Sequence, residues 1–303
     1  MNRIWITWET QRRSIELAKH LNCKLFIFEE EGYLRCPRAI LKTIQALRSS
    51  KPAIVFVQNP SMILALLACL YKIITRTPVV VDRHTTFLLD KEYKNSFRII
   101  IFKILHHLTI RWADLTIITN EYLAMIVSKM HGRSFVLPDP LPDISSSKKI
   151  NLKGIKNILM ISSFGSDEPI TEILAAMETL NENIVLYITG NYKKLDSKIV
   201  DTVPNNVVFT GFLDDQDFIN MIYSVDAIMV LTTAESCMLC GCYEAVAAGQ
   251  PLITSNMKAL REYFTGAYFV DNNCNAISRG IQNILDNLDQ YRSNALELKN
   301  TLL

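Results

Sequence analysis

The sequence predicts an α/β fold with two doubly wound domains, each built on a parallel sheet. Short apolar segments alternate with amphipathic helical segments almost throughout the 303 residues, which is typical of βαβ units. The alternation stops at Leu137–Pro142, where three prolines exclude a helix or a central strand, and then restarts. We therefore expect a first domain at 1–140, a linker at 141–153 and a second domain at 154–303.

The expected strands are short and continuously apolar, as in parallel sheets that helices cover on both faces. For the first half we expect strands at Arg3–Trp8, Cys23–Phe28, Ala53–Val57, Pro78–Val81, Leu115–Thr119 and Phe135–Leu137. The helices between them are expected at Arg12–Leu21, Pro37–Arg48, Pro60–Lys72, Lys91–Trp112 and from Asn120. For the second half we expect strands at Asn157–Ser162, Ile184–Thr189, Val207–Thr210, Ala227–Leu231 and near Tyr268–Val270, with helices at Pro169–Leu180 and Asp215–Tyr223 and others toward the C-terminus.

Composition narrows the class of protein. A net charge of +2 does not indicate nucleic acid as a partner. Seven cysteines without regular spacing indicate reduced thiols in a cytoplasmic protein. The apolar run Met62–Leu70 is shorter than the roughly 20 residues that span a bilayer, and no secretory signal is expected at Met1. Cys237, Cys240 and Cys242 have no paired half downstream, so we expect no metal site.

The segment Met238–Ser255 predicts a binding site for a sugar nucleotide. It reads as a polar loop, a short helix, a tight turn and a buried strand. Gly241 stands near the helix start, where bare N–H groups can meet a diphosphate, and Glu244 one turn later can hold a ribose hydroxyl. The candidate donor-binding residues of this segment are Met238, Leu239, Cys240, Gly241 and Glu244. Just before it, Glu235 is either a contact to the donor sugar or a solvated loop acid.

Three glycines end expected strands of the second half and add to this site. Parallel sheets bind ligands at the carboxyl ends of their strands, and Gly190 and Gly211 would let a base or a sugar approach the backbone. Gly165 either admits a phosphate or belongs to an ordinary turn, and Asp167 and Glu168 beside it speak against a phosphate there. The neighbouring Asn191 and Phe212 complete the predicted set of donor residues.

In the first half, polar residues follow the first and fourth strands. Arg12 and Arg13 could face a phosphate across a cleft, or they could simply be solvated. Asp82, Arg83 and His84 end another strand, where an acid and an imidazole suit acid/base catalysis or a grip on sugar hydroxyls. A lone histidine is more often structural.

The expected helix Lys91–Trp112 carries basic residues among apolar ones. Such a helix suits an anionic membrane surface, which would make the protein peripheral on the inner face of the cell membrane. The alternative is a core-facing helix with a solvated basic side.

The block Glu244-Ala-Val-Ala-Ala-Gly-Gln-Pro251, the two halves and the proline-rich segment resemble GT-B type glycosyltransferases, in particular retaining family 4, the glycosyl transferases group 1. That family has two glutamates with seven residues between them, whereas eight residues separate Glu235 from Glu244 here, so either a residue is inserted or Glu235 is not the equivalent acid. It also carries an Arg and a Lys where this sequence has Asp167 and Glu168, which makes Arg12 or Arg13 a candidate substitute. Asp82-Arg-His84 resembles the acceptor-side Asp-x-His of the family.

The resemblance implies two Rossmann-like domains facing across a cleft, the first for the acceptor and the second for the donor. It implies a hexosyltransferase-like enzyme that moves a sugar, with retention, from a nucleotide-diphosphate donor to a hydroxyl of a saccharide or lipid-linked acceptor in polysaccharide or glycoconjugate biosynthesis. The nucleotide sugar is a co-substrate, and no cofactor is expected. A sugar-nucleotide epimerase of the same fold and a catalytically degenerate GT-B partner subunit remain alternatives.

Overall fold

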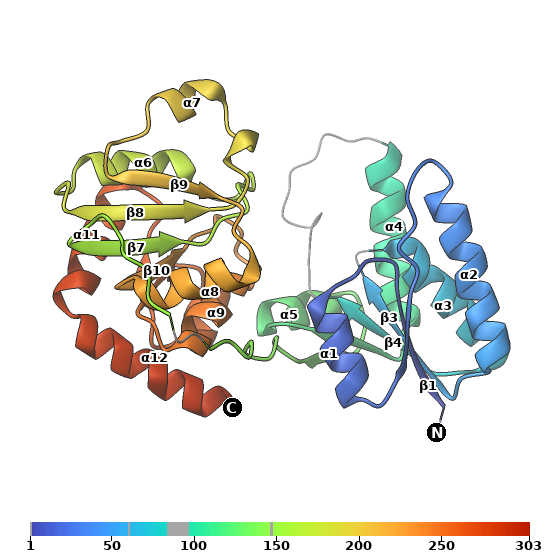
Figure 1. Cartoon of the computed structure of the whole chain (residues 1–303). Helices are drawn as coiled ribbons and strands as arrows, with labels where there is room; N and C mark the ends of the chain where they lie inside the picture. The colour runs from blue at the N-terminus through green and yellow to red at the C-terminus, as the bar shows by residue number, and fades with distance from the viewer. Residues whose placement is uncertain (1, 60, 84–96, 146–147) are drawn as a thin grey trace. The chain divides into compact units, whose positions relative to one another are not determined.

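The computed structural model describes residues 2–59, 61–83, 97–145 and 148–303. The chain divides into two compact units, Met1–Asp139 and Pro140–Leu303 (Figure 1). The residues expected to form a linker, 141–153, fall within the second unit. There Leu141 and Ile144, together with Ile150 and Leu152, pack against the second unit's core.

The first unit contains, in the residues described, a parallel sheet with the strand order β2-β1-β3-β4-β5-β6. Its strands are β1 (Arg3–Thr7), β2 (Lys24–Ile27), β3 (Ile54–Asn59), β4 (Val79–Arg83), β5 (Leu115–Ile118) and β6 (Ser134–Val136). Its helices are α1 (Arg12–His20), α2 (Arg35–Ser50), α3 (Met62–Thr75), α4 (Phe97–Trp112) and α5 (Glu121–Lys129).

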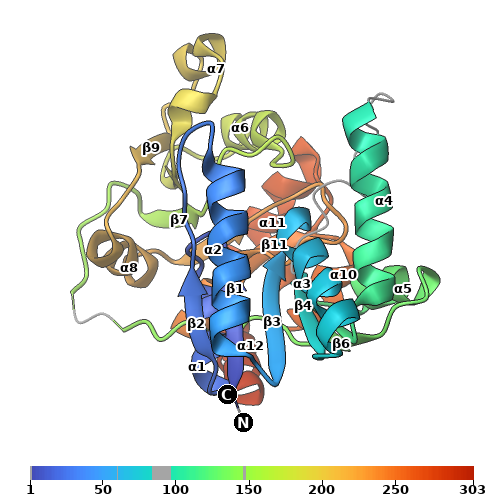
Figure 2. The same cartoon turned by 90° about the vertical axis from the view of Figure 1, so that its right-hand side faces the viewer.

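The strands carry apolar side chains on both faces of the sheet, which explains why helices pack on both faces. On one face Ile4 and Ile6 pack with α3, and the alternate residue Trp5 packs with α1 on the other. Figure 2 shows α2 and α3 on the same side of this sheet, while α1 lies on the opposite side in Figure 1. The carboxyl ends of all these strands are therefore left at one edge, where polar side chains follow them.

The second unit repeats the architecture with the strand order β12-β11-β10-β7-β8-β9, again all parallel. Its strands are β7 (Lys156–Met160), β8 (Ile184–Thr189), β9 (Val207–Gly211), β10 (Ala227–Val230), β11 (Leu252–Ser255) and β12 (Tyr268–Val270). Its helices are α6 (Ile170–Glu178), the 3-10 turn η1 (Tyr192–Lys194), α7 (Ser197–Asp201), α8 (Asp215–Ser224), α9 (Cys240–Ala248), α10 (Lys258–Tyr263), α11 (Cys274–Asp286) and α12 (Leu288–Leu302).

These two sheets confirm the predicted fold class, and the observed strands and helices lie close to their expected positions. The short η1, α7 and α10 were not expected, because pieces of three to six residues carry too little periodicity to be recognised. The turn after α9 was expected from Gly249, which adopts a left-handed conformation with φ +65. Within the part of the chain described, no helix is long and apolar enough to cross a bilayer.

Candidate functional site

The N-terminus of α9 lies directly against the second unit's sheet. A Cβ at Gly241 would meet Ile161 Cβ and Val230 Cγ2, each at 3.0 Å. Glycine therefore lets the first helical turn approach the carboxyl ends of β7 and β10, and that turn contains no acidic residue that would complement the positive end of the helix dipole. Glu244 stands one turn further on, half-buried between the buried Tyr243 and Ala245. The predicted pairing of a helix N-terminus with an acid is thus present at the carboxyl edge of the sheet.

The loop between β7 and α6 is closed by one carboxylate. Glu168 accepts hydrogen bonds from the backbone N–H groups of Ser163 at 2.9 Å and Phe164 at 3.1 Å, and from the hydroxyls of Ser162 and Ser163. A phosphate bound by those N–H groups would have to displace Glu168. Gly165 sits in this loop, and its Cβ position is 2.8 Å from an Asp167 carboxylate oxygen, so the loop surrounding Gly165 carries negative charge.

The second acid of this loop links it to the neighbouring strand end. Asp167 accepts from the Thr232 hydroxyl at 2.6 Å, and its carbonyl accepts from the Thr233 N–H at 2.7 Å. The carboxyl ends of β7 and β10 are therefore held together by Asp167, which has a structural task here.

A basic side chain that the sequence analysis did not single out reaches the same loop. Lys194 is exposed, lies in η1 after β8, and donates from Nζ to the Ser163 carbonyl at 2.7 Å. Asn191, predicted as a donor residue, accepts from the Lys193 N–H at 3.3 Å and so shapes η1. The sequence could have indicated Lys194, because the segment Asn191–Lys194 directly follows the end of an expected strand.

The two other predicted glycines differ in their surroundings. Gly190 has φ +104, and its Cβ position would lie 2.2 Å from the Ser162 carbonyl oxygen, so the chain's own backbone requires this glycine. Gly211 has φ +74 with no atom within 4 Å of its Cβ position. Phe212 beside it is 88% exposed. An open backbone and an exposed aromatic ring at the end of β9 offer a surface on which a flat base can stack.

The structure accounts for the remaining acid of this region and for the buried thiol of Cys242. Glu235 accepts the Lys258 N–H at 2.6 Å and thereby caps the start of α10. Cys242 is fully buried, and burial raises the pKa of its thiol to about 12, so it stays protonated. Among the residues that the structure describes, no group of three or more His, Cys, Asp and Glu side chains is arranged to hold a metal ion.

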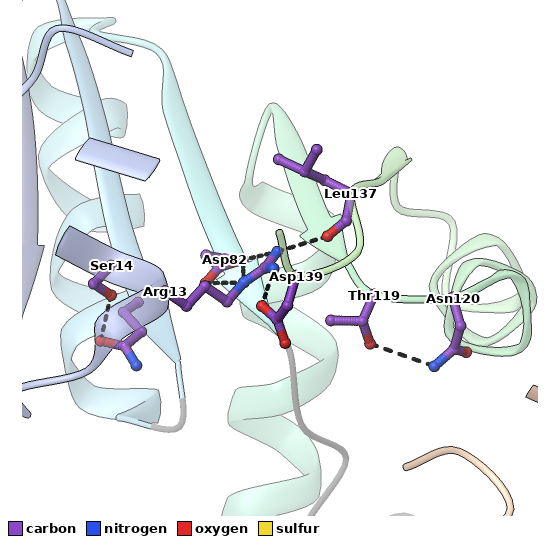
Figure 3. A network of polar contacts seen from close by, with 8 residues as sticks. Arg13, Ser14, Asp82, Thr119, Asn120, Leu137 and Asp139 are labelled. Atoms are coloured by element: carbon purple, nitrogen blue, oxygen red, sulfur yellow. Dashed lines mark hydrogen bonds and ion pairs between the residues drawn. The ribbon is translucent and has the colours of Figure 1, made fainter. Parts of the chain in front are cut away.

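In the first unit, Arg13 connects three segments that are far apart in the sequence (Figure 3). From α1 it donates Nε to both oxygens of Asp82 at 3.1 Å and Nη2 to Asp82 at 3.0 Å. It also donates to Asp139 at 2.5 Å and to the Leu137 carbonyl at 2.8 Å. Burial alone would lower the pKa of Arg13, but the carboxylates of Asp82 and Asp139 raise it above its ordinary value.

The burial of Arg13 and Asp82 gives this ion pair a structural task. Arg13 and Asp82 are 7% and 1% exposed, so their charges compensate each other inside the unit and hold the point where the chain leaves it. Arg12, the adjacent candidate, is exposed. A second polar contact lies nearby, in which the Ser14 hydroxyl donates to Gln58 at 2.7 Å.

Arg83, at the end of β4, is buried against a histidine. Its Nη1 lies 2.7 Å from Nδ1 of His106, and its Nη2 donates to the Thr109 hydroxyl at 3.0 Å. Burial, then the charge of Arg83, lowers the pKa of His106 to about 3. The imidazole is therefore neutral and accepts at Nδ1, because a guanidinium can only donate. His84, the predicted catalytic histidine, lies outside the described residues.

Solved structures with both units are similar to this chain. Sucrose-phosphate synthase from Thermosynechococcus elongatus has a TM-score of 0.78 at 14% identity, covering 100% of this chain and 94% of that chain. HepE from Anabaena, in complex with UDP and glucose, has a TM-score of 0.74 at 13% identity and covers 100% and 95%. The lipopolysaccharide outer core galactosyltransferase WaaB has a TM-score of 0.65 at 13% identity and covers 100% of both chains.

At these identities the likeness establishes the fold, two Rossmann-like domains of the GT-B type. No curated protein sequence matches the chain. The family model for glycosyl transferases group 1 matches residues 143–297. This match spans more than half of the sequence and almost all of the second unit, in which Gly241 and Glu244 lie. The chain therefore belongs to the glycosyl transferases group 1 family.

Proposed function

We propose that this glycosyltransferase transfers a sugar from a nucleoside-diphosphate donor, bound by the second unit, to a hydroxyl of a saccharide acceptor bound by the first unit. The observation that carries the proposal is the α9 N-terminus, packed against the sheet through Gly241 with Glu244 one turn later. It lies within the segment that the family model matches. The presence of UDP and glucose in the HepE structure is consistent with such a donor.

Each feature of this edge has a proposed task. The exposed ring of Phe212 stacks on the base, Glu244 accepts from ribose hydroxyls, and the N–H groups of Cys240, Gly241 and their neighbours bind the diphosphate. Lys194 supplies a positive charge in place of the family's basic pair, because the β7–α6 loop contains the anionic Glu168. Charge on the leaving diphosphate is then stabilised by the helix and by this lysine, without a resident cofactor.

On the acceptor side we propose His84 as the group that contacts the transferred sugar. Asp82, two positions earlier, is fully engaged by Arg13, so its proposed task is to position the end of β4. Arg83 has the same kind of task toward His106 and Thr109, and Arg12 remains an exposed candidate for contact with a phosphate.

We further propose a lipid-linked acceptor and weak attachment to the inner face of the cell membrane. Lys103 is exposed on α4, and His107 and Arg111 are exposed on the same helix. Each basic side chain near an anionic surface contributes about 1 kcal/mol. We expect co-sedimentation with anionic but not neutral vesicles, decreasing with salt. Replacing Lys94, Arg98 and Lys103 together by Gln should abolish this co-sedimentation. Lys94 and the side chain of Arg98 lie outside the described residues. Failure to bind at low salt would refute attachment.

Nucleotide binding tests the donor site. Calorimetry with uridine and guanosine diphosphates should show binding that Glu244→Gln weakens by about 1–3 kcal/mol, the cost of a lost charge-assisted hydrogen bond. Lys194→Gln should weaken the binding of nucleoside diphosphates but leave the binding of the free nucleoside unchanged, because the lysine charge interacts only with the diphosphate. Glu297→Gln, an exposed change on α12, is the matched control. A Glu244 variant that binds normally would refute the site.

Product analysis separates the proposed reaction from its alternatives. Transfer requires both donor and acceptor and yields a new glycoside. An epimerase would convert the donor sugar without an acceptor. A degenerate partner subunit would bind nucleotide weakly or not at all and form no product. Retention is tested by the anomeric configuration of the product.

A further inference from the structure

The first unit contains a cavity of about 630 Å³ at the carboxyl edge of its sheet. Residues that follow β1, β2 and β3 form part of its wall, and α2 and α4 complete it. The volume lies within the range of about 300–1,000 Å³ that holds small molecules, and parallel sheets bind their ligands at this edge. The Arg13 and Asp82 contacts do not contribute to it.

The walls of the cavity are largely apolar. The apolar side chains that line it include Trp8, Phe28, Met62, Ile101, Phe102 and Leu105. At its border Ile63 and Ile101 are 38% and 41% exposed, and Ile100 and Ile104 on α4 are 50% and 53% exposed. Apolar surface therefore continues from the cavity to the outside, as an acceptor with a long apolar group would require.

The polar part of the lining is acidic. It holds Glu9, Glu29, Glu30 and Glu31, and Arg35 is the basic side chain among the described lining residues. Glu30 pairs with Lys42, and when the charge of Arg35 is also counted against the four carboxylates, two negative charges remain. The N-terminus of α3 also borders the cavity, but a helix contributes only about half a positive charge. This excess of negative charge disfavours anionic ligands.

We infer that this cavity binds the apolar-linked end of a phosphate-free acceptor: a sugar whose hydroxyls donate to the glutamates and whose aglycone lies along the apolar wall. The inference rests on the proposed function, because transfer requires an acceptor hydroxyl in the first unit. Carboxylates accept hydrogen bonds from hydroxyls, whereas a phosphate placed beside them meets like charge. Acceptors that carry a phosphate next to the apolar group should therefore bind more weakly.

Two probes of equal chain length test the inference with the full chain and without nucleotide. By calorimetry, octyl glucoside below its micellar concentration should bind, and octyl phosphate should bind about tenfold more weakly at low salt. Binding should alter the fluorescence of Trp8, and Ile63→Trp should weaken binding of the glucoside by narrowing the cavity. The double substitution Glu29→Gln with Glu31→Gln should remove the preference for octyl glucoside over octyl phosphate.

The matched control replaces exposed acids on the second unit, Glu172→Gln with Glu178→Gln, and should keep the preference. Equal or tighter binding of octyl phosphate, no binding of either probe, or binding that Ile63→Trp leaves unchanged would each overturn the inference. Because no nucleotide is present, the result is independent of the donor site. A chain that binds octyl glucoside selectively but no nucleoside diphosphate would refute the proposed function alone.

Discussion

His106 should make the stability of the first unit depend on pH in mildly acidic solution. The side chain is 3% exposed and accepts from Arg83 at 2.7 Å. Burial, and then the neighbouring guanidinium, lowers its pKa from the ordinary 6.5 to about 3. A histidine held neutral in this way must be protonated at a cost when the surrounding pH falls.

Proton linkage gives the sign and the size of this pH effect on the unfolding free energy. Between pH 6.5 and 3 the unfolded chain binds a proton at this site that the folded chain does not, so stability falls as pH falls through this window. The slope is about 1.4 kcal/mol per pH unit, and the loss between about pH 7 and about pH 5 is about 2 kcal/mol. This is a large fraction of the stability of a small domain.

The assay uses the placement of tryptophan. The chain contains three tryptophans, Trp5, Trp8 and Trp112, and all belong to the first unit, so urea unfolding followed by their fluorescence reports on that unit. His106→Gln keeps an acceptor for Arg83 but cannot titrate. We expect it to remove the stated slope between about pH 6 and about pH 4, whereas the surface change His20→Gln should not. Equal slopes in His106→Gln and the parent protein would refute the reasoning.

Three further changes test other contacts. Asp82→Asn leaves Arg13 with one carboxylate, so the first unit should lose about 3 kcal/mol of unfolding free energy; an unchanged fluorescence midpoint in urea would contradict this. Gly241→Val forces α9 away from Ile161 and should cost the second unit about 1–3 kcal/mol, seen as a lower midpoint by circular dichroism, together with lost nucleotide binding. Phe212→Ala should weaken the binding of nucleoside diphosphates by about 1–3 kcal/mol, because the base loses its stacking partner. Calorimetry measures this change, and an unchanged affinity would mean that the base does not bind at Phe212.

The sequence by itself determined the fold class and the local structure of the segment Met238–Ser255. Apolar runs such as Val55–Val57 can be buried only in a sheet that is covered on both faces, and this property is local. The segment Met238–Ser255 likewise contains its own helix start, acid, turn and strand, because these features depend on neighbours within a few residues. Their placement could be predicted for that reason.

The tertiary structure alone decided which side chains meet. Arg13 bonds to Asp82 and Asp139, which lie 69 and 126 positions away, and the sequence had left Arg13 as a candidate for phosphate binding. The closure of the β7–α6 loop by Glu168, the reach of Lys194 to that loop and the acidic cavity were also decided by the fold. The physical reason is that strand order brings distant loops to one edge of a sheet, and the hydrophobic pattern that specifies each strand carries no information about its neighbours.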